Sequence, residues 1–199
     1  MRRRRDGAGQ RSGGTGFAGA GAGVRLVRVA AVAGVVALGA VLVWRLAHQN
    51  TKVAKAVANG KIVPAPAFDL SALSGTGRVS LAALRGNAVV VNFWASDCGP
   101  CKKEMPQLQA ASDRYAGKGV RFVGIDVLDF RGPARSFVRK HNVRYAIGFD
   151  GVGDTTIDYG VANTPTTFFI DRRGRIVAQV VGPMSDSDLA DHVRRALTT

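Results

Sequence analysis

The feature that most constrains the fold of this chain is the placement of its two cysteines, in the sequence Cys98-Gly-Pro-Cys101. Shortly before them lies Ala88–Trp94, an almost wholly apolar and β-branched run typical of a central strand covered on both faces. A helix is predicted to begin near Cys98 and to continue to about Tyr115. The two thiols are therefore expected where a buried strand gives way to a helix.

This placement suits disulfide exchange. The thiolate is the attacking species, and the positive end of a helix lowers the pKa of a cysteine located there. Cys98 is therefore expected to attack first. Cys101 lies one turn further along the same helix face and is expected to resolve the mixed disulfide. Between them, Gly99 and Pro100 set the turn and the redox poise.

A zinc site is the alternative for a Cys-x-x-Cys pair, because zinc ribbons use the same spacing. Such a site needs two further ligands, whereas the three histidines, His48, His141 and His192, stand far apart in the sequence. Two cysteines are also too few for a disulfide framework. A reversible dithiol without a metal is the favoured interpretation.

From Ala67 onward, short apolar runs alternate with amphipathic segments, which is the pattern of an α/β sheet. A serine with an aspartate three residues later predicts a capping box at the last helix. The expected elements are a strand over 120–127, a helix from Gly132 to about His141, a hairpin of 168–171 with 175–181, and a helix over 185–197.

The segment before this domain divides into three parts. Residues 1–28 are rich in Arg, Gly and Ala and are expected to be a disordered basic tail. Residues 29–48 are predicted to be a transmembrane signal anchor, because Val29–Trp44 carries no charge and extends for about 24 Å as a helix. Residues 49–66 have no strong period and are expected to be a linker to a domain over 67–199. A cleaved signal peptide and a buried helix are the alternatives to the anchor.

The charge distribution gives the expected topology and argues against a nucleic-acid partner. The net charge is +14, but residues 1–64 hold 11 Lys/Arg and one Asp, whereas 65–199 hold 17 Lys/Arg and 13 acids. The excess lies in the tail, and no basic stripe with aromatic residues accompanies it. Seven arginines precede Val29, so the N-terminus is expected in the cytoplasm and the domain outside it, with a single pass through the cell membrane.

The sequence resembles a known family at two places. The run from Phe93 to Pro106, Phe-Trp-Ala-Ser-Asp-Cys-Gly-Pro-Cys-Lys-Lys-Glu-Met-Pro, resembles the active site of TlpA/ResA-like thiol:disulfide oxidoreductases of the thioredoxin-like superfamily. The run from Asn163 to Asp171 matches the later half of the same family, so the resemblance covers about residues 65–199. It implies a thioredoxin-like fold, a central mixed sheet with helices on both faces.

The resemblance also implies site residues. Thr164-Pro165 is expected to be a cis peptide that faces the cysteine pair and grips extended substrates, and an X-Pro bond adopts cis at a cost of only about 0.5–1 kcal/mol. Trp94, Gly99 and Pro100 are expected to contribute to substrate binding beside it.

Glu104 lies one turn beyond Cys101 on the face that must pack against the sheet. A buried carboxyl has a raised pKa and is suited to shuttle the proton that Cys101 loses or gains. Thioredoxin has an aspartate where this chain has Asn92, so Glu104 is the remaining candidate. An exposed helix former is the alternative. Pro106 is expected to kink this helix.

The residue before the first cysteine departs from the family pattern. Tryptophan is usual there, and this chain has Asp97. A carboxylate beside Cys98 opposes the effect of the helix dipole and raises the thiol pKa, whereas Asp97 or Ser96 as a cap would stabilise the helix. Substrate preference and redox potential are therefore not fixed by the resemblance.

The predicted function is reduction of disulfides in exported proteins, for example apocytochrome c during cytochrome c maturation. Electrons are expected from a membrane partner protein, and no separate cofactor is needed. Three rivals stay open: a disulfide oxidase, a thiol peroxidase of the peroxiredoxin type, and a non-catalytic binding module held at the membrane. The Pro-x-x-x-Thr-x-x-Cys arrangement of peroxiredoxins is absent before Cys98.

Overall fold

The structure is a computed structural model that describes residues 34, 36–41 and 52–199. The chain divides into two compact units, residues 1–45 and 46–199. In the first unit, residues 36–41 are helical and exposed. The expected tail over 1–28 and most of the expected anchor over 29–48 lie outside the described residues. Within the described part, no helix has the length and hydropathy needed to span a bilayer.

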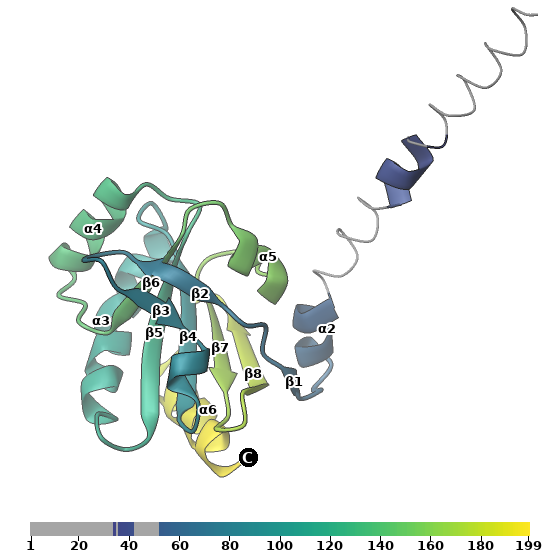
Figure 1. The fold of residues 1–199 in the computed structure, drawn as a ribbon. Helices are drawn as coiled ribbons and strands as arrows, with labels where there is room; N and C mark the ends of the chain where they lie inside the picture. Colours follow the sequence, from purple (N-terminus) through teal and green to yellow (C-terminus); the bar gives the residue numbers. More distant parts are fainter. Residues whose placement is uncertain (1–33, 35, 42–51) are drawn as a thin grey trace, which may run out of the picture. The chain divides into compact units, whose positions relative to one another are not determined.

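The second unit is built on one mixed sheet of eight strands in the order β1-β8-β7-β4-β5-β6-β2-β3. Strands β4, β5 and β6 are parallel to one another, and every other pairing is antiparallel. Figure 1 shows the order. The strands are β1 Val63–Pro64, β2 Asp69–Ala72, β3 Arg78–Ser80, β4 Ala88–Trp94, β5 Val120–Val127, β6 Ala146–Asp150, β7 Thr166–Ile170 and β8 Arg175–Val181. The predicted mixed α/β sheet is confirmed.

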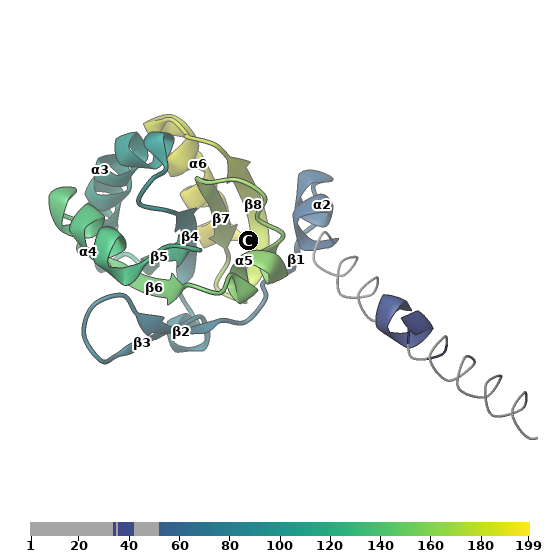
Figure 2. The same ribbon diagram turned by 90° about the horizontal axis from the view of Figure 1, so that it is seen from above.

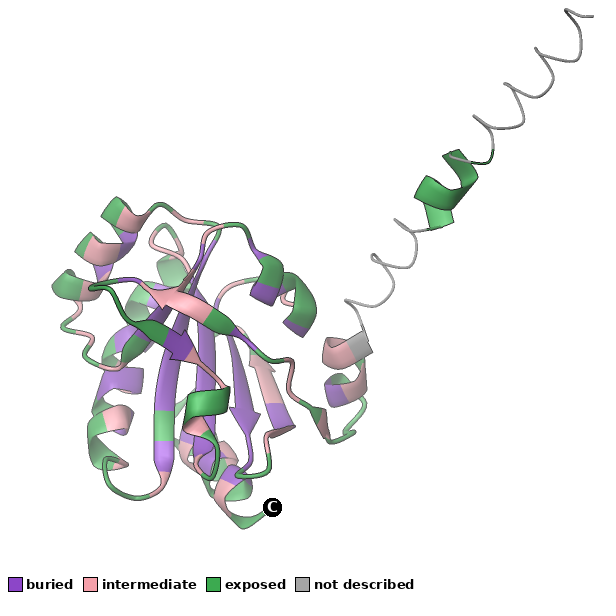
Figure 3. Cartoon of the chain, viewed as in Figure 1, coloured by how far each residue is buried: buried purple, intermediate pink, exposed green. Residues whose placement is uncertain are grey.

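Strand β4 lies inside the sheet because its sequence has no polar face. All seven residues are buried, and β7 and β5 pair with it on its two sides. Strand β5 is buried except at Arg121. Figure 3 shows buried residues running through the middle of the sheet, with the exposed residues on the outer helices and loops.

Helices cover both faces of the sheet. One face packs against α3 Gly99–Arg114, α4 Arg131–Lys140 and α6 Asp186–Thr198. Figure 2 shows α3 and α4 next to each other beside the central strands. The other face is covered by α5 Asp154–Tyr159, by α2 Lys52–Ala58 and by Phe68 and Val79. The alternating residues of β4 and β5 thus fill two separate apolar layers.

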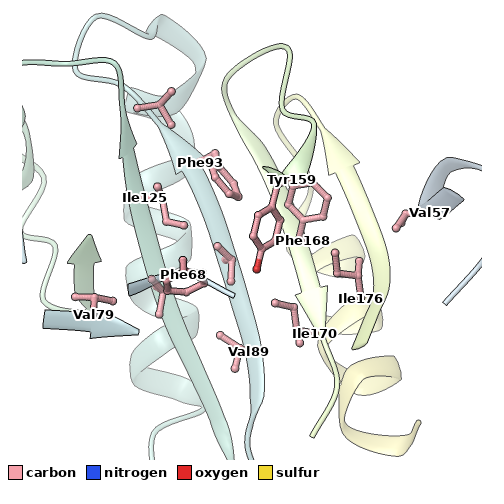
Figure 4. Packing of buried hydrophobic residues seen from close by; sticks show 13 residues of the cluster. Val57, Phe68, Val79, Val89, Phe93, Ile125, Tyr159, Phe168, Ile170 and Ile176 are labelled. Carbon is pink, nitrogen blue, oxygen red and sulfur yellow. The ribbon is translucent and has the colours of Figure 1, made fainter. Parts of the chain in front are cut away.

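Tyr159 organises the second of these layers. Its ring lies 5.2 Å from that of Phe93 and 5.1 Å from that of Phe168, measured between ring centroids. Its hydroxyl donates to the backbone oxygen of Pro66 at 2.9 Å, so the buried phenol is satisfied. Figure 4 shows the ring between its aromatic neighbours. The contact fixes the chain just before β2 to the core.

Part of the segment expected to be a linker is folded onto the sheet. Residues 52–58 form α2, and Val57 is only 8% exposed in the layer around Tyr159. Val63 then pairs with Ile176, so β1 covers the outer edge of β8. The reason is a short apolar repeat: Val53 and Val57 stand four residues apart and share one helix face. The boundary expected at residue 67 therefore moves toward the N-terminus.

The structure also contains further elements that the sequence pattern did not predict, among them β2, β3, β6 and α5. The carboxylate of Asp150, at the end of β6, accepts from the backbone amides of Thr155 and Thr156 at 3.3 and 2.9 Å. Gly153 and Gly160 flank α5 in the left-handed conformation. At the last helix, the predicted capping box of Ser185 and Asp188 is present.

Candidate active site

Cys98 occupies the cap position of α3. Its backbone is extended, at φ −69° and ψ 108°, and its Sγ accepts from the backbone amide of Cys101 at 3.2 Å. The expectation that Ser96 or Asp97 caps this helix was therefore wrong. The redox sulfur itself takes the place of the usual capping oxygen, directly at the positive end of the helix.

The two cysteines differ in their access to solvent. They are joined as a disulfide in this structure, with Cα atoms 5.3 Å apart. Cys101 is 1% exposed, whereas Cys98 is partly exposed, and Gly99 and Pro100 between them are exposed. An incoming disulfide reaches Cys98 first, and Cys101 is shielded on the core side. This asymmetry suits the predicted order of attack and resolution.

Glu104 lies in a buried polar network beneath the cysteines. It is 2% exposed, and its Oε2 accepts from Nδ2 of Asn92 at 3.1 Å. Asn92 also donates to Oγ1 of Thr167, on the neighbouring strand β7, at 2.9 Å. Oε1 of Glu104 has no partner within the described residues. Burial raises the pKa of Glu104 to about 7, and the Asn92 hydrogen bond offsets part of this effect.

The network explains why a carboxyl is retained at this buried position. A fully apolar site would leave one of the two N–H groups of the Asn92 amide without an acceptor, and a fully paired carboxylate would have a low pKa. Glu104 has one oxygen satisfied and one free, so both of its protonation states are accessible near neutral pH. Glu104 and Cys101 are three residues apart in α3 and both buried, so they share one helix face. Pro106 lies inside the same helix, as expected.

Trp94 differs from its predicted role. It is fully buried, and its indole is stacked on the ring of Phe137 of α4 at a centroid distance of 4.9 Å. It also packs with Cys101 and Met105 in one apolar cluster. A side chain with no exposed surface does not contact a protein substrate. Trp94 is a core residue that supports the cysteine end of α3.

Thr164-Pro165 is a cis peptide, as the resemblance implied. Phe93 pairs with Thr166 across β4 and β7, which brings this peptide to the same end of the sheet as the cysteine loop. Thr164 and Asp97 line one open groove of about 590 Å³. The other wall of that groove is formed by the loop after β5, where Leu128 and Phe130 are 67% and 80% exposed. The groove reaches Asp97, the residue directly before Cys98.

Sequence reasoning missed one buried acid at this end of the sheet. Asp126 of β5 pairs in register with Trp94, is fully buried, and has no partner for either carboxyl oxygen in the described part of the chain. Burial, followed by the neighbouring carboxyl of Asp129, raises its pKa to about 8. A signal was present, because Asp126 is the single acid in a strand whose only other charged residue is Arg121.

No group of three or more His, Cys, Asp or Glu suited to a metal ion occurs among the described residues. A buried strand, a dithiol at a helix start and a cis-proline opposite it together define a thioredoxin-like redox domain. The model of the family described as Redoxin matches residues 58–193. The chain belongs to the Redoxin family, and within it to the TlpA/ResA-like thiol:disulfide oxidoreductases.

Known relatives agree with this assignment. The thiol-disulfide oxidoreductase ResA of Bacillus subtilis is 32% identical over 129 residues, covering 65% of this chain and 72% of that protein. A solved thiol:disulfide interchange protein of Chlorobium tepidum has a TM-score of 0.61 at 30% identity, covering 68% and 97% of the two chains. A solved secreted thiol-disulfide isomerase of Corynebacterium glutamicum has a TM-score of 0.61 at 25% identity, covering 66% and 83%. The protein is a thiol:disulfide oxidoreductase.

Proposed function

We propose that this oxidoreductase is a reductase, which opens disulfides in exported proteins such as apocytochrome c through the dithiol of Cys98 and Cys101. The main support for this proposal is the arrangement of the two cysteines. Cys98 is partly exposed at the start of a helix, beside an open groove, whereas Cys101 is buried in the same helix as the buried carboxyl of Glu104. Cys98 attacks the substrate disulfide and forms a mixed disulfide. Cys101 then attacks Cys98, which releases the substrate with two thiols and leaves the enzyme oxidised.

Electrostatics around Cys98 support this direction. A strongly oxidising dithiol needs a stabilised thiolate. Here the exposed carboxylate of Asp97 is adjacent to Cys98, and Glu104 lies beneath the pair, so two acids disfavour thiolate charge. Lys102 and Lys103 act in the opposite sense, but both are exposed and water screens them. The reduced form is therefore stabilised little beyond the contribution of the helix dipole, which favours a low reduction potential.

The proposal includes the location and the electron source. We assign residues 29–48 as an uncleaved membrane anchor, with the N-terminus in the cytoplasm and the redox domain outside it. The C. glutamicum relative, described as secreted, supports an exported domain. Each turnover consumes two electrons, which a membrane partner protein supplies to the Cys98–Cys101 disulfide. The dithiol is the whole redox group, so no separate cofactor takes part.

The reduction potential of the pair tests the direction. Potentials in this fold range from about −270 mV in reducing members to about −120 mV in oxidising ones. We expect the full chain, equilibrated in defined dithiol buffers and trapped by alkylation, to lie near the reducing end. A value above about −180 mV would favour the oxidase.

Variants separate the remaining rivals. Cys98→Ser abolishes insulin reduction, whereas Cys101→Ser accumulates mixed disulfides on gels run without reducing agent. Trapping by Cys98→Ser in place of Cys101→Ser would reverse the two roles. Turnover of hydrogen peroxide would indicate a peroxidase. Absence of insulin reduction by the wild-type protein would indicate a binding module. If a reporter that works only in the cytoplasm is active when fused to the C-terminus, the proposed topology is wrong.

A further inference from the structure

Two polar side chains interrupt the apolar layer that packs against α3 and α6. On this face of the sheet, β4 and β7 place Val90 opposite Phe169, and the next pair in register is Asn92 opposite Thr167. Asn92 is 2% exposed and Thr167 is 0% exposed. Burying an amide and a hydroxyl costs free energy unless each finds a partner. The pair therefore needs a role that apolar residues would not fill.

The Asn92 amide is shared between Thr167 and Glu104. Its Nδ2 donates to Oγ1 of Thr167 at 2.9 Å and to Oε2 of Glu104 at 3.1 Å. A side-chain amide has two N–H groups, so the hydroxyl takes one of them and the carboxyl takes the other. An unpaired buried N–H is costly, so without the hydroxyl the amide would have to turn toward another acceptor.

This arrangement distinguishes the two oxygens of Glu104. Oε2 accepts from Asn92, whereas Oε1 has no partner within the described residues. The N–H that faces Oε2 stabilises the carboxylate and occupies the side from which a proton would bind that oxygen. A proton taken up by Glu104 is therefore expected on Oε1.

Few titratable groups lie on the elements around Glu104. Helix α3 contributes Cys101, one turn earlier, and its lysines are exposed. Strand β5 contributes the buried Asp126, and α6 contributes His192, which lies against β7. Burial, followed by the charge of Glu104, raises the pKa of Tyr145 before β6. Strands β4 and β7 contribute none. Within the described part of the chain, the amide on β4 is the one side chain that hydrogen-bonds to this carboxyl.

We propose that Thr167 is a positioning residue for proton transfer at the dithiol. It holds the Asn92 amide so that Asn92 donates to Oε2 of Glu104 and the proton binds at Oε1. Thr167 lies on β7, two residues after Pro165 of the cis peptide, so one strand supports both features. The inference rests on the proposed function, with Glu104 as the group that holds the proton of the buried cysteine, but not on the direction of electron flow.

Thr167→Val tests the hydroxyl, because valine has nearly the same shape and cannot accept a hydrogen bond. The pKa of Glu104 is measured by carbon NMR of the oxidised full chain, in which the thiols do not titrate, and is expected near 7 in the wild type. Thr167→Val weakens the Asn92 contact and raises this pKa by about 0.4 to 1, as expected for one neutral hydrogen bond. Thr167→Ser keeps the hydroxyl and retains the wild-type value.

Asn92→Leu removes the donor itself and has the larger effect. The carboxylate loses its hydrogen bond, so the pKa of Glu104 rises by about 1 to 2. The carbonyl stretch of the protonated acid moves to higher frequency in the infrared spectrum, because Oε2 no longer accepts. In both variants the pH profile of insulin reduction moves by the same amount as the pKa.

Thr166→Val is the matched control. Thr166 is the preceding residue of β7, is 1% exposed, and donates from its hydroxyl to the backbone oxygen of Asn163 at 2.7 Å. Successive residues of a strand point to opposite faces of the sheet, so this change removes a buried hydroxyl on the side away from Asn92. The pKa of Glu104 is expected to stay at its wild-type value.

Several results would overturn the proposal. One is a Glu104 pKa that does not change in Thr167→Val, or that rises as much in Thr167→Ser, which would assign the effect to packing. An infrared band that does not move in Asn92→Leu would place the proton on Oε2. A shifted pKa with an unshifted profile of insulin reduction would remove Thr167 from the exchange reaction. If Thr167→Val does not fold, Thr167→Ala replaces it, with the same rise expected.

Failure of the proposed function would give a different result. Absence of insulin reduction by the wild-type protein would refute the reductase. The NMR and infrared measurements use the protein without substrate, so they still decide whether Thr167 and Asn92 position the proton of Glu104.

Discussion

Buried acids occur at both ends of the sheet, and they differ in the number of hydrogen-bond donors around them. At the turn between β7 and β8, Asp171 is 1% exposed and accepts from the backbone amides of Arg173 and Arg175 at 3.0 and 2.8 Å. Its other oxygen lies 2.7 Å from the guanidinium of Arg175. At the cysteine end, Asp150 is satisfied by the amides at the start of α5. Among the described residues, however, Glu104 has a partner for only one oxygen and Asp126 has a partner for neither.

The number of hydrogen-bond donors separates an acid with a structural role from acids that are able to take part in proton transfer. Asp171 closes a hairpin, and both of its oxygens have hydrogen-bond donors. Glu104 and Asp126 lie where donors are missing, so both have raised pKa values, about 7 and about 8. A carboxyl deprived of donors is less stable when ionised, but it is able to hold a proton at neutral pH. The chain has such carboxyls at the end that performs thiol chemistry.

The largest effect of this difference between the acids is expected in the rate of disulfide exchange. Glu104→Gln keeps the shape and the acceptor for Asn92 but removes titration. We expect disulfide exchange to slow by roughly 10 to 1,000-fold, because proton transfer to a positioned side chain contributes about 10² to 10⁴. The pH profile of the rate should also lose one step, since a carboxyl next to a dithiol titrates as part of a coupled unit.

Asp171→Asn is the matched control, because it also neutralises a buried acid. It should lower stability and leave the exchange rate of the folded protein unchanged. Wild-type rates and cysteine titrations in Glu104→Gln would instead identify water as the proton carrier.

The dependence of stability on pH is the second test. In the unfolded chain both acids ionise near their ordinary values, 4.5 for Glu104 and 3.8 for Asp126, so the folded state binds more protons between about pH 4 and 8. Their contribution to stability is full below about pH 4 and is lost as pH rises through 7 for Glu104 and 8 for Asp126. For Glu104 the loss is on the order of 3 kcal/mol.

Urea unfolding of the oxidised protein at several pH values measures this slope. Between pH 5 and 7 two acids contribute, so Glu104→Gln should roughly halve the fall in the free energy of unfolding, by linkage. An equal slope in wild type and variant would show that Glu104 is already ionised at pH 5 in the folded state.

The smallest effect is expected for an acid that is exposed to solvent. Asp97 is exposed beside Cys98, so Asp97→Asn should lower the Cys98 pKa by only about 0.1 to 0.7, in keeping with the energies of exposed charge pairs. Alkylation rates at low and high salt measure it, and salt should reduce the difference. A shift that persists in high salt would place the Asp97 carboxylate in direct contact with the sulfur.

Much of this site follows from local sequence. The apolar run of β4 predicts a central strand, and the motif after it predicts a dithiol at a helix start. The period of the helix places Glu104 one turn beyond Cys101, on the face that packs against the sheet. Each of these predictions involves neighbours in sequence, so the pattern alone carries them. The cis peptide at Pro165 followed from the family resemblance.

The parts that were missed depend on contacts between distant segments. The burial of Trp94 is set by Phe137 of α4, and the raised pKa of Asp126 is set by its burial and by the carboxyl of Asp129. The docking of α2 depends on an apolar layer built from β4, β7 and β8. Spacing within one segment does not reveal these partners. An acid inside an apolar strand is the one local clue that was available.

Strand β1 limits self-association of the protein through the edge of its sheet. An open sheet edge offers unpaired amides and carbonyls to any passing chain, and short strands with proline limit such pairing. Here β8 is covered by a two-residue strand that ends in Pro64, while β3 at the opposite edge is three residues long and begins with Arg78. A fragment cut at residue 67 would lose β1 and leave β8 open to self-association. A fragment beginning at residue 52 keeps this edge closed, and is the better starting point for a soluble domain.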